Sequence, residues 1–354
     1  MTEKQLIENE LALSNSQPTL HNLKYGKNML HAPKKEKAQA TQDYFNITDY
    51  AVKTGYVNSY IDRLTITGNL PDEYIGLDDP FGIMPWVRLA TFAGGGWRGQ
   101  YFPDRKQKLY LEYDPANAEK MRKRNFRVEC NPNLLAMDQL HFLFDTILPK
   151  LTKPAISRLD LAFDFERNLN EFRFDKAVTG GKFWDKAGKT QTVYFGAPSS
   201  DCRIRIYDKK AERLAKGSEE DKADYSAYDV LWRLEFELTG SGYIEKAVRQ
   251  NFRVLQDTKI VKRNYEMELD VPLSPLEKIM IKALDNEKDL FAELAPASKA
   301  KYRKMADKVV EVDLTDNLRE LLRNMQVGSD SPLAVDVKTF CTKILAGENP
   351  IRKG

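Results

Sequence analysis

The chain has 354 residues, of which 42% are hydrophobic, so it can bury a full core, and its length predicts two domains. No apolar run approaches the ~20 residues that cross a bilayer, and the polar start MTEKQLIENE lacks the apolar region of a signal peptide. The three cysteines have no paired spacing, which indicates a reducing, cytoplasmic compartment and argues against a zinc site. A formal net charge of +3 is weak support for a DNA partner, so local charge has to be examined instead.

The first part of the chain is expected to lack a fold. Residues 1–55 are polar and aperiodic and include a charged linker, which predicts a disordered tail. Alternating strands begin at about residue 57, and residues 137–148 have the spacing of an amphipathic helix.

An internal repeat organises the middle of the chain. Three strand-like blocks occur in the same order in both halves, which predicts two copies, 56–150 and 151–245, of one βαβ-like or split β-unit. The block pairs are Ile61–Thr67 with Ile156–Ala162, Leu109–Asp114 with Ile204–Asp208, and Phe126–Cys130 with Trp232–Phe236. Because Thr65 stands where the second copy has Asp160, we interpret the first copy as scaffold and the second as catalytic.

Two alternating segments of the second copy carry acids on their polar face. Residues 158–165 place Asp160 and Asp164 on one side, and residues 231–238 place Glu235 and Glu237 on one side. Such strands are also common in half-buried sheets without any ligand. Carboxylates on two strands that can be neighbours nevertheless suit Mg²⁺ or Mn²⁺, which can polarise a phosphodiester oxygen. Only three histidines are present and none is paired, so a histidine base or a Ser-His-Asp triad is disfavoured.

The run Arg203–Lys210 contains the candidate nucleophile. Alternation directs Ile204 and Ile206 to a core and places Tyr207 on the other face with Arg203 and Arg205. A tyrosine at a strand end more often only packs. A phenol beside guanidinium groups is, however, a candidate nucleophile toward a phosphodiester, because the cations bind phosphate and favour the phenolate.

Residues 246–354 are predicted to be mainly helical. Expected helices begin after Ser274 with Glu277 three residues on, run from Ser298 to about Val310, follow Thr315 to residue 325, and span 332–345. The segment 298–308 carries five basic residues against one acid, Asp307. A solvated helix face and a DNA-binding helix both fit this run, whose basic residues are Lys299, Lys301, Arg303, Lys304 and Lys308.

Five blocks carry a family resemblance. LYLEYD, NFRVECNPNLL, RLDLAFDFE, RIRIYDKKAER and LWRLEFEL resemble, in the same order, the Rep_trans family, the replication initiators of staphylococcal rolling-circle plasmids. The similarity covers roughly residues 60–320. It implies an α+β fold in which a duplicated β-sheet nicking domain precedes a mainly helical DNA-recognition region at 246–354.

The resemblance also implies roles for residues. The family's nicking tyrosine lies in an Arg-Ile-Tyr-Asn-Lys-Lys segment, which matches Tyr207 here, with Asp208 in place of the asparagine. Apart from the resemblance, we expect Arg205 and Lys209 to offset the charge that builds on the phosphoryl oxygens, and Arg203 and Lys210 to contact DNA. The family's metal-binding acids match Asp160 and Glu235, with Glu237 and Asp164 as further candidates, and the basic helix matches the family's origin-specificity region.

The expected function is therefore sequence-specific nicking of one strand at a double-stranded plasmid origin through a 5′-phosphotyrosine, followed by strand transfer. The expected partners are double- and single-stranded DNA, a second copy in a homodimer, and a host helicase, with no membrane. Two alternatives stay open: a relaxase of a conjugative or integrative element, and a DNA-binding replication-control protein that lacks the reaction.

Overall fold

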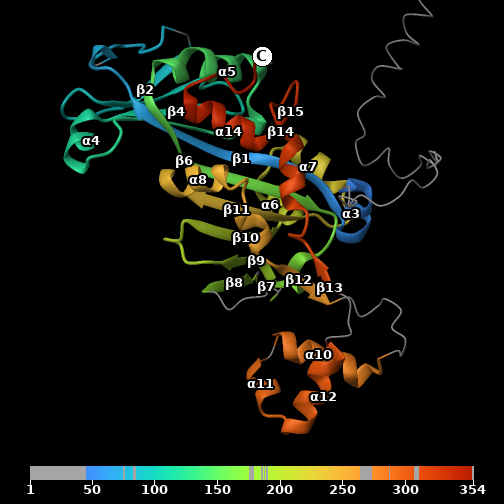
Figure 1. Ribbon diagram of the computed structural model, residues 1–354. Coiled ribbons are helices and arrows are strands. Elements are labelled where there is room, and N and C mark those ends of the chain that lie inside the picture. The colour runs from blue at the N-terminus through green and yellow to red at the C-terminus, as the bar shows by residue number, and fades with distance from the viewer. Residues whose placement is uncertain are drawn as a thin grey trace, which may run out of the picture. The chain divides into compact units, whose positions relative to one another are not determined.

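A computed structural model describes residues 45–352 apart from 75, 83–84, 175–178, 185, 187, 189, 264–272, 287 and 307–310. Its centre is one large, mostly antiparallel sheet (Figure 1). In spatial order its main strands are β2 (Trp86–Thr91), β3 (Trp97–Tyr101), β4 (Leu109–Tyr113), β5 (Phe126–Cys130), β1 (Tyr56–Asn69), β6 (Thr152–Phe165), β11 (Trp232–Thr239), β10 (Cys202–Asp208), β9 (Thr190–Phe195) and β8 (Gly180–Trp184).

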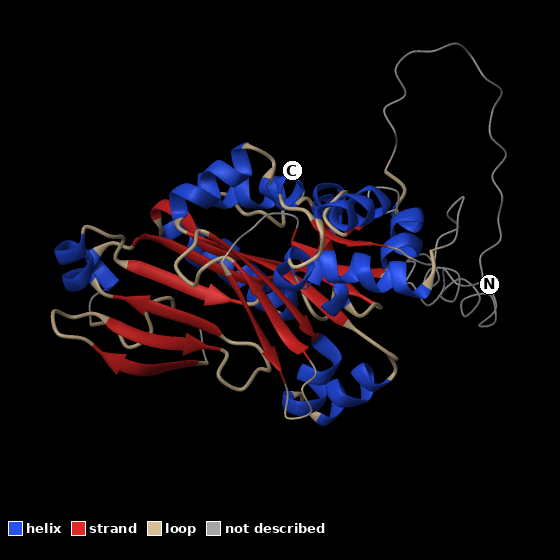
Figure 2. Ribbon diagram, turned by 90° about the horizontal axis from the view of Figure 1, so that it is seen from below, coloured by secondary structure: helices blue, strands red, loops and turns tan. Residues whose placement is uncertain are grey.

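The order of these strands is symmetric about the pair β1 and β6. Moving outward, β5, β4, β3 and β2 on one side correspond to β11, β10, β9 and β8 on the other. Since the repeated sequence blocks fall on β1, β4 and β5 and again on β6, β10 and β11, the two halves of the sheet are the two copies. The two long central strands are antiparallel, and Figure 2 shows the strands as one continuous twisted layer.

The sheet has one apolar face and one polar face because its strands alternate. Leu159, Leu161 and Phe163 of β6 and Leu234 and Phe236 of β11 are fully buried on the apolar side. This side is covered by α8 (Ser241–Arg249) and α14 (Val337–Ala346), which lie against β6 (Figure 1). The polar side carries the candidate site.

The remaining helices are short. They are α3 (Ile47–Thr54), α4 (Pro115–Met121), α5 (Met137–His141), α6 (Lys209–Lys216), α7 (Glu219–Ser226), α9 (Val254–Asp257), α10 (Pro275–Asn286), α11 (Lys288–Ala292), α12 (Pro296–Ala306) and α13 (Leu318–Leu321). The helix predicted at 137–148 is divided, because α5 passes into a π-helix at Phe142–Ile147 and a 3-10 turn at Leu148–Lys150. The fold is α+β, as predicted.

The predicted tail ends earlier than residue 55. Residues 1–44 lie outside the described part of the chain, but α3 is a capped helix. The Asn46 side chain accepts hydrogen bonds from the first-turn amides of Thr48 and Asp49, and Gly55 ends the helix in the left-handed conformation. Tyr50 is buried, and its hydroxyl donates to the Leu314 carbonyl 2.5 Å away, which fixes the helix to a distant segment.

The chain beyond residue 246 also contributes strands. β12 (Ile260–Arg263) lies between β13 (Glu311–Asp313) and β7 (Arg173–Phe174) in a second sheet, and β14 (Met325–Val327) pairs with β1 and with β15 (Leu333–Val335). The helix predicted after Thr315 is therefore only α13 plus a 3-10 turn, and the one predicted at 332–345 starts at Val337. The Thr315 hydroxyl instead donates to the Thr258 carbonyl.

The C-terminal helices α10 and α12 pack together around their own small core. Ile281 and Ala306 are buried there, with Leu273, Leu284 and Met305 against them. The predicted capping box at the start of α10 is present, since the Ser274 amide donates to Glu277 at 3.0 Å. Helix α12 starts at Pro296 rather than at Ser298, because proline suits the first helical position, and Lys308 lies outside the described residues.

Candidate active site

Strand pairing brings the predicted site residues together on the polar face of β6, β11 and β10. Across β10 and β11, Tyr207 lies opposite Arg233, Arg205 opposite Glu235, and Arg203 opposite Glu237. Across β11 and β6, Arg233 lies opposite Asp164 and Glu237 opposite Asp160. We call this set of eight side chains the catalytic face: Asp160, Asp164, Arg203, Arg205, Tyr207, Arg233, Glu235 and Glu237.

Two cations, Arg205 and Lys209, lie close to Tyr207. The Arg205 guanidinium carbon is 3.9 Å from the centre of the Tyr207 ring, and Lys209 Nζ is 3.4 Å from the phenol oxygen. Only 3% of the tyrosine is exposed. Burial raises the pKa of the Tyr207 phenol well above its usual value, and it outweighs the lowering by Arg233 and Arg205. The two arginines thus favour the phenolate, as expected, but burial favours the neutral phenol more strongly.

Lys209 and Asp208 start α6 at the end of β10. The Asp208 carboxylate caps the helix by accepting from the Ala211 amide at 2.8 Å, which fixes where the chain turns after Tyr207. Burial, together with Arg233 and Arg213, lowers the pKa of the Lys209 amine, even though Glu212 accepts its hydrogen bond at 2.9 Å. Lys210, predicted to contact DNA, instead donates to backbone carbonyls of Tyr228 and Asp229.

The two aspartates of β6 are held by arginines. Asp160 accepts from Arg158 Nε at 2.9 Å and from its Nη2 at 2.8 Å, and Asp164 accepts from Arg233 at 2.6 and 2.9 Å. Burial raises the pKa of the Asp160 carboxyl to about 6 against the opposing effect of Arg158, and the neighbouring Glu237 raises it further. Both oxygens of each aspartate are therefore occupied.

The glutamates of β11 are bound more loosely. Glu235 lies 3.5 Å from Arg205, and Glu237 lies 3.9 Å from Arg203 and 4.0 Å from Arg158. Burial, followed by the charge of Asp62, raises the pKa of the Glu235 carboxyl to about 7. Glu235 also keeps one buried carboxylate oxygen, Oε2, without a hydrogen bond.

These carboxylates are the type of ligand that a hard divalent cation binds, but their side chains are not placed around a common point where an ion could lie. Asp160, Glu235 and Glu237 offer oxygen donors on one face, they repel one another, and one Glu235 oxygen has no donor. As the side chains stand, however, no group of three or more His, Cys, Asp or Glu residues within the described ranges is placed to hold a metal ion. A cation would have to displace Arg158 from Asp160.

Arg233 and Asp62 are site residues that sequence reasoning did not select. Arg233 is 3% exposed and also reaches Asp62 at 3.1 Å, so it links β11, β6 and β1. A β-bulge between Ile61 and Arg63 breaks the alternation of β1 and brings Asp62 to this group. Arg233 could have been found from its alternation with Glu235, whereas no sequence signal marks the bulge.

The first copy has no tyrosine at the place of Tyr207. There Glu112 lies opposite Arg127, which is the place that Tyr207 takes opposite Arg233 in the second copy. The nearby Tyr113 is fully buried on the apolar side. The scaffold role predicted from Thr65 therefore has a second basis in the strand register.

The chain is similar in sequence to replication initiation proteins. Residues 63–151 match the RepD-like model of the N-terminal domain of replication initiation proteins. A replication initiation protein of Staphylococcus aureus is 33% identical over 312 residues, covering 82% of this chain and 92% of the relative, and a second from that species is 32% identical over 289 residues, covering 77% and 87%. The chain therefore belongs to the replication initiation proteins, the family that its sequence blocks resemble.

Among solved structures, the chain is similar to a rolling circle replication initiator protein from Geobacillus stearothermophilus. The two are 19% identical with a TM-score of 0.32, over 65% of this chain and 84% of that one. In the described part of the chain, no helix has the length and apolar character needed to cross a membrane.

Proposed function

We propose that this replication initiator starts rolling-circle replication of a plasmid by nicking one strand of the double-stranded origin and joining itself to the new 5′ end. The main support for the proposal is that Tyr207 lies between Arg205 and Lys209. The same sheet face carries the acids and arginines of β6, β11 and β10. The family resemblance of the segment around Tyr207 adds support. It also suggests a homodimer that recruits a host helicase.

In the proposed reaction, Tyr207 Oη attacks the scissile phosphorus. The new bond joins Oη to phosphorus while the bond from phosphorus to the 3′ oxygen breaks, so the products are a 5′-phosphotyrosine and a free 3′-OH. The phenol proton leaves to solvent while Lys209, whose Nζ lies 3.4 Å from the phenol oxygen and donates to it, offsets the developing negative charge, and the leaving 3′ oxygen takes a proton from solvent. The reverse attack by a 3′-OH restores the tyrosine and joins strands without a nucleotide.

Arg205 has two parts in this proposal. Its guanidinium lies over the Tyr207 ring, so the tyrosine becomes accessible when Arg205 turns toward a phosphate. Its planar fork then offsets the charge that develops on the phosphoryl oxygens. Its Nε has no hydrogen-bond partner within the described residues, so this donor is available to a phosphate.

A bound Mg²⁺ or Mn²⁺ ion would polarise a phosphoryl oxygen. We propose that Asp160, Glu235 and Glu237 would hold it, because they share one face and Glu235 Oε2 accepts no hydrogen bond, being 3.5 Å from Arg205. Asp164 is assigned to Arg233 instead, since that buried arginine holds both its oxygens, whereas the Arg158 side chain bound to Asp160 is 30% exposed and can turn away.

The direct test uses supercoiled DNA that carries the sequence flanking the gene. With Mg²⁺ or Mn²⁺, the protein is expected to convert it to open circles that carry covalent protein at a 5′ end. Open circles without attached protein would exclude the phosphotyrosine, and unchanged supercoils that the protein still binds would favour a non-enzymatic control protein.

The acids of the catalytic face can be separated from their counterparts in the first copy. Asp160→Ala and Glu235→Ala are each expected to lower Mg²⁺- or Mn²⁺-dependent cleavage by orders of magnitude, because they remove oxygen donors beside the reacting phosphate. Thr65→Ala and Glu129→Ala are the matched controls, since they occupy the repeat-equivalent strands. Cleavage rates across a metal titration decide the matter, and equal losses from all four changes with unaltered folding would contradict the division of roles.

Helix α12 is the proposed origin-recognition element. Its cations Lys301, Arg303 and Lys304 are exposed, Lys299 is half-buried, and among them only Lys301 forms an ion pair within the described residues, with Glu277 at 3.5 Å. Phosphate contacts give sequence-independent affinity, whereas side chains that reach base edges discriminate by about 1–3 kcal/mol per good pair.

Exchanging Pro296–Lys304 for the matching stretch of a related initiator is expected to redirect origin choice. The rate of cleavage of a single-stranded oligonucleotide that carries the nick site should not change, because the catalytic face is untouched. Competition binding between the two origins measures the preference. An exchanged protein that kept its original preference would place recognition elsewhere in the chain.

A further inference from the structure

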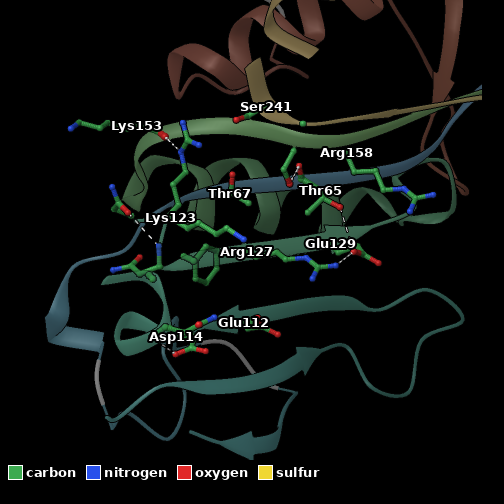
Figure 3. A pocket seen from close by; sticks show the side chains of 18 of the residues that line it. Thr65, Thr67, Glu112, Asp114, Lys123, Arg127, Glu129, Lys153, Arg158 and Ser241 are labelled. Carbon is green, nitrogen blue, oxygen red and sulfur yellow. Dashed lines mark hydrogen bonds and ion pairs between the residues drawn. The ribbon is translucent and has the colours of Figure 1, made fainter. Parts of the chain in front are cut away.

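A cleft of about 980 Å³ lies on the polar side of the first copy (Figure 3). We call it the first-repeat cleft, and its floor continues the catalytic face. Arg158, which holds Asp160, lines it, and so does Thr239 at the end of β11. Its main polar lining residues are Arg63, Thr65, Thr67, Glu112, Asp114, Arg122, Lys123, Arg124, Arg127, Glu129, Lys153 and Ser241.

The charge of the first-repeat cleft is unbalanced in favour of cations. Two of its three acids are ion-paired, because Glu129 binds Arg63 and Arg127, and Glu112 binds Arg98 at 2.9 Å. The third, Asp114, caps α4 by accepting from the Asn117 amide. Four exposed cations, by contrast, form no ion pair with any residue that the structure describes: Arg122, Lys123, Arg124 and Lys153. Figure 3 labels Lys123 and Lys153 among the lining side chains. Such a surface fits a polyanion.

Two of these cations have a backbone conformation that glycine adopts more readily than other residues. Arg122 has a φ of 52° and Lys153 a φ of 51°, both in the left-handed region that side chains disfavour. Arg122 directly follows α4, and Lys153 is the second residue of β6. Two charged residues in a disfavoured backbone conformation at one cleft indicate that their charges have a function there.

An exposed aromatic ring lies on the same sheet face. Tyr110 of β4 is 46% exposed and lines a shallow hollow with Arg98, Glu112, Arg127 and Glu129, the last three of which also line the first-repeat cleft. In register, Tyr110 lies opposite Glu129 as Arg205 lies opposite Glu235. An open ring beside guanidinium groups can stack an unpaired base, whereas the bases of a duplex are already stacked on each other.

We propose that the first-repeat cleft binds the single-stranded DNA that flanks the nick site, with Tyr110 stacking a base and the four cations meeting phosphates. This inference rests on the proposed nicking function. The pair Arg158 and Thr239 lines the cleft, and the pair Asp164 and Arg233 lies beside Tyr207. Six residues of β11 separate the two pairs, which is a rise of roughly 20 Å. The copy that lost its nucleophile would thus hold the strand that the other copy cuts.

The test measures binding of the full chain to a labelled oligo(dT), which needs no knowledge of the origin. Tyr110→Ala is expected to weaken binding about 10-fold, and Tyr110→Phe, which keeps the ring, to bind as the wild type does. Lys123→Ala with Lys153→Ala should lower the slope of log affinity against log salt by about 1.4. Lys246→Ala with Lys338→Ala is the matched control, because both lysines are exposed on the helices of the opposite face.

Unchanged oligo(dT) affinity in both cleft variants, with wild-type melting curves, would overturn the proposal. So would a larger loss for duplex DNA than for oligo(dT), because that result would make the cleft a duplex site. Failure of the nicking function is recognised separately: the wild-type protein would then leave supercoiled origin DNA intact, whatever the cleft variants do to oligo(dT) binding.

Discussion

Tyr207→Phe is expected to abolish both nicking and covalent attachment to DNA while leaving origin binding within a few-fold of the wild type. The change removes the attacking oxygen, so cleavage should fall by at least ~10³-fold, as for other enzymes that lose their nucleophile. Packing should survive, because the buried ring and the Arg205 guanidinium over it are kept. Denaturing gels of protein bound to a labelled 5′ end measure the adduct.

Tyr194→Phe is the matched control for this experiment. Tyr194 lies on the neighbouring strand β9 beneath Arg203, whose guanidinium carbon is 3.8 Å from the ring centre, just as Arg205 lies over Tyr207. It should keep full covalent attachment. A DNA adduct on the Tyr207→Phe protein would move the nucleophile to another tyrosine, and peptide mapping would show whether Tyr194, Tyr225 or Tyr228 carries it.

The arrangement of the catalytic face follows from local sequence rules, but its ion pairs do not. Alternation with a period of two is a property of any strand, so the shared face of Arg205 and Tyr207 could be predicted without a partner strand. Which acid meets which arginine depends on register between strands distant in the chain, and alternation alone leaves that register open. The contacts of Arg233 with Asp164 and Asp62 are of this kind, because they join three strands that lie far apart in the chain.

The parts of the fold that escaped prediction have similar causes. The bulge that brings Asp62 to Arg233 is a local irregularity of β1, and no glycine or proline lies at Ile61–Arg63 to mark it. The strand β14 is only three residues long, and it exists because β1 and β15 offer it pairing partners. The burial of Tyr207 is likewise a tertiary effect, and it reverses the direction of the pKa that its charged neighbours alone suggest.

Asp164→Ala is expected to lower the free energy of unfolding by about 3–5 kcal/mol, because it leaves the buried Arg233 guanidinium without its bidentate partner. Asp62 offers only partial compensation, through a single contact at 3.1 Å. Urea unfolding measures the loss. Asp138→Ala is the matched control, since its pair with Arg105 at 3.0 Å is exposed and should be worth at most ~1 kcal/mol.

The same variant decides between a structural and a metal-binding role for Asp164. If Asp164 only binds Arg233, the loss in free energy of unfolding is the same with and without Mg²⁺. The double variant Arg233→Met with Asp164→Leu should then recover most of that loss, because it replaces the buried ion pair with apolar side chains. Asp62 would then keep its hydrogen bond from Asn131 at 3.1 Å. A loss that appears only when Mg²⁺ is present would instead make Asp164 a ligand of the ion, because only the wild-type protein would then be stabilised by binding it.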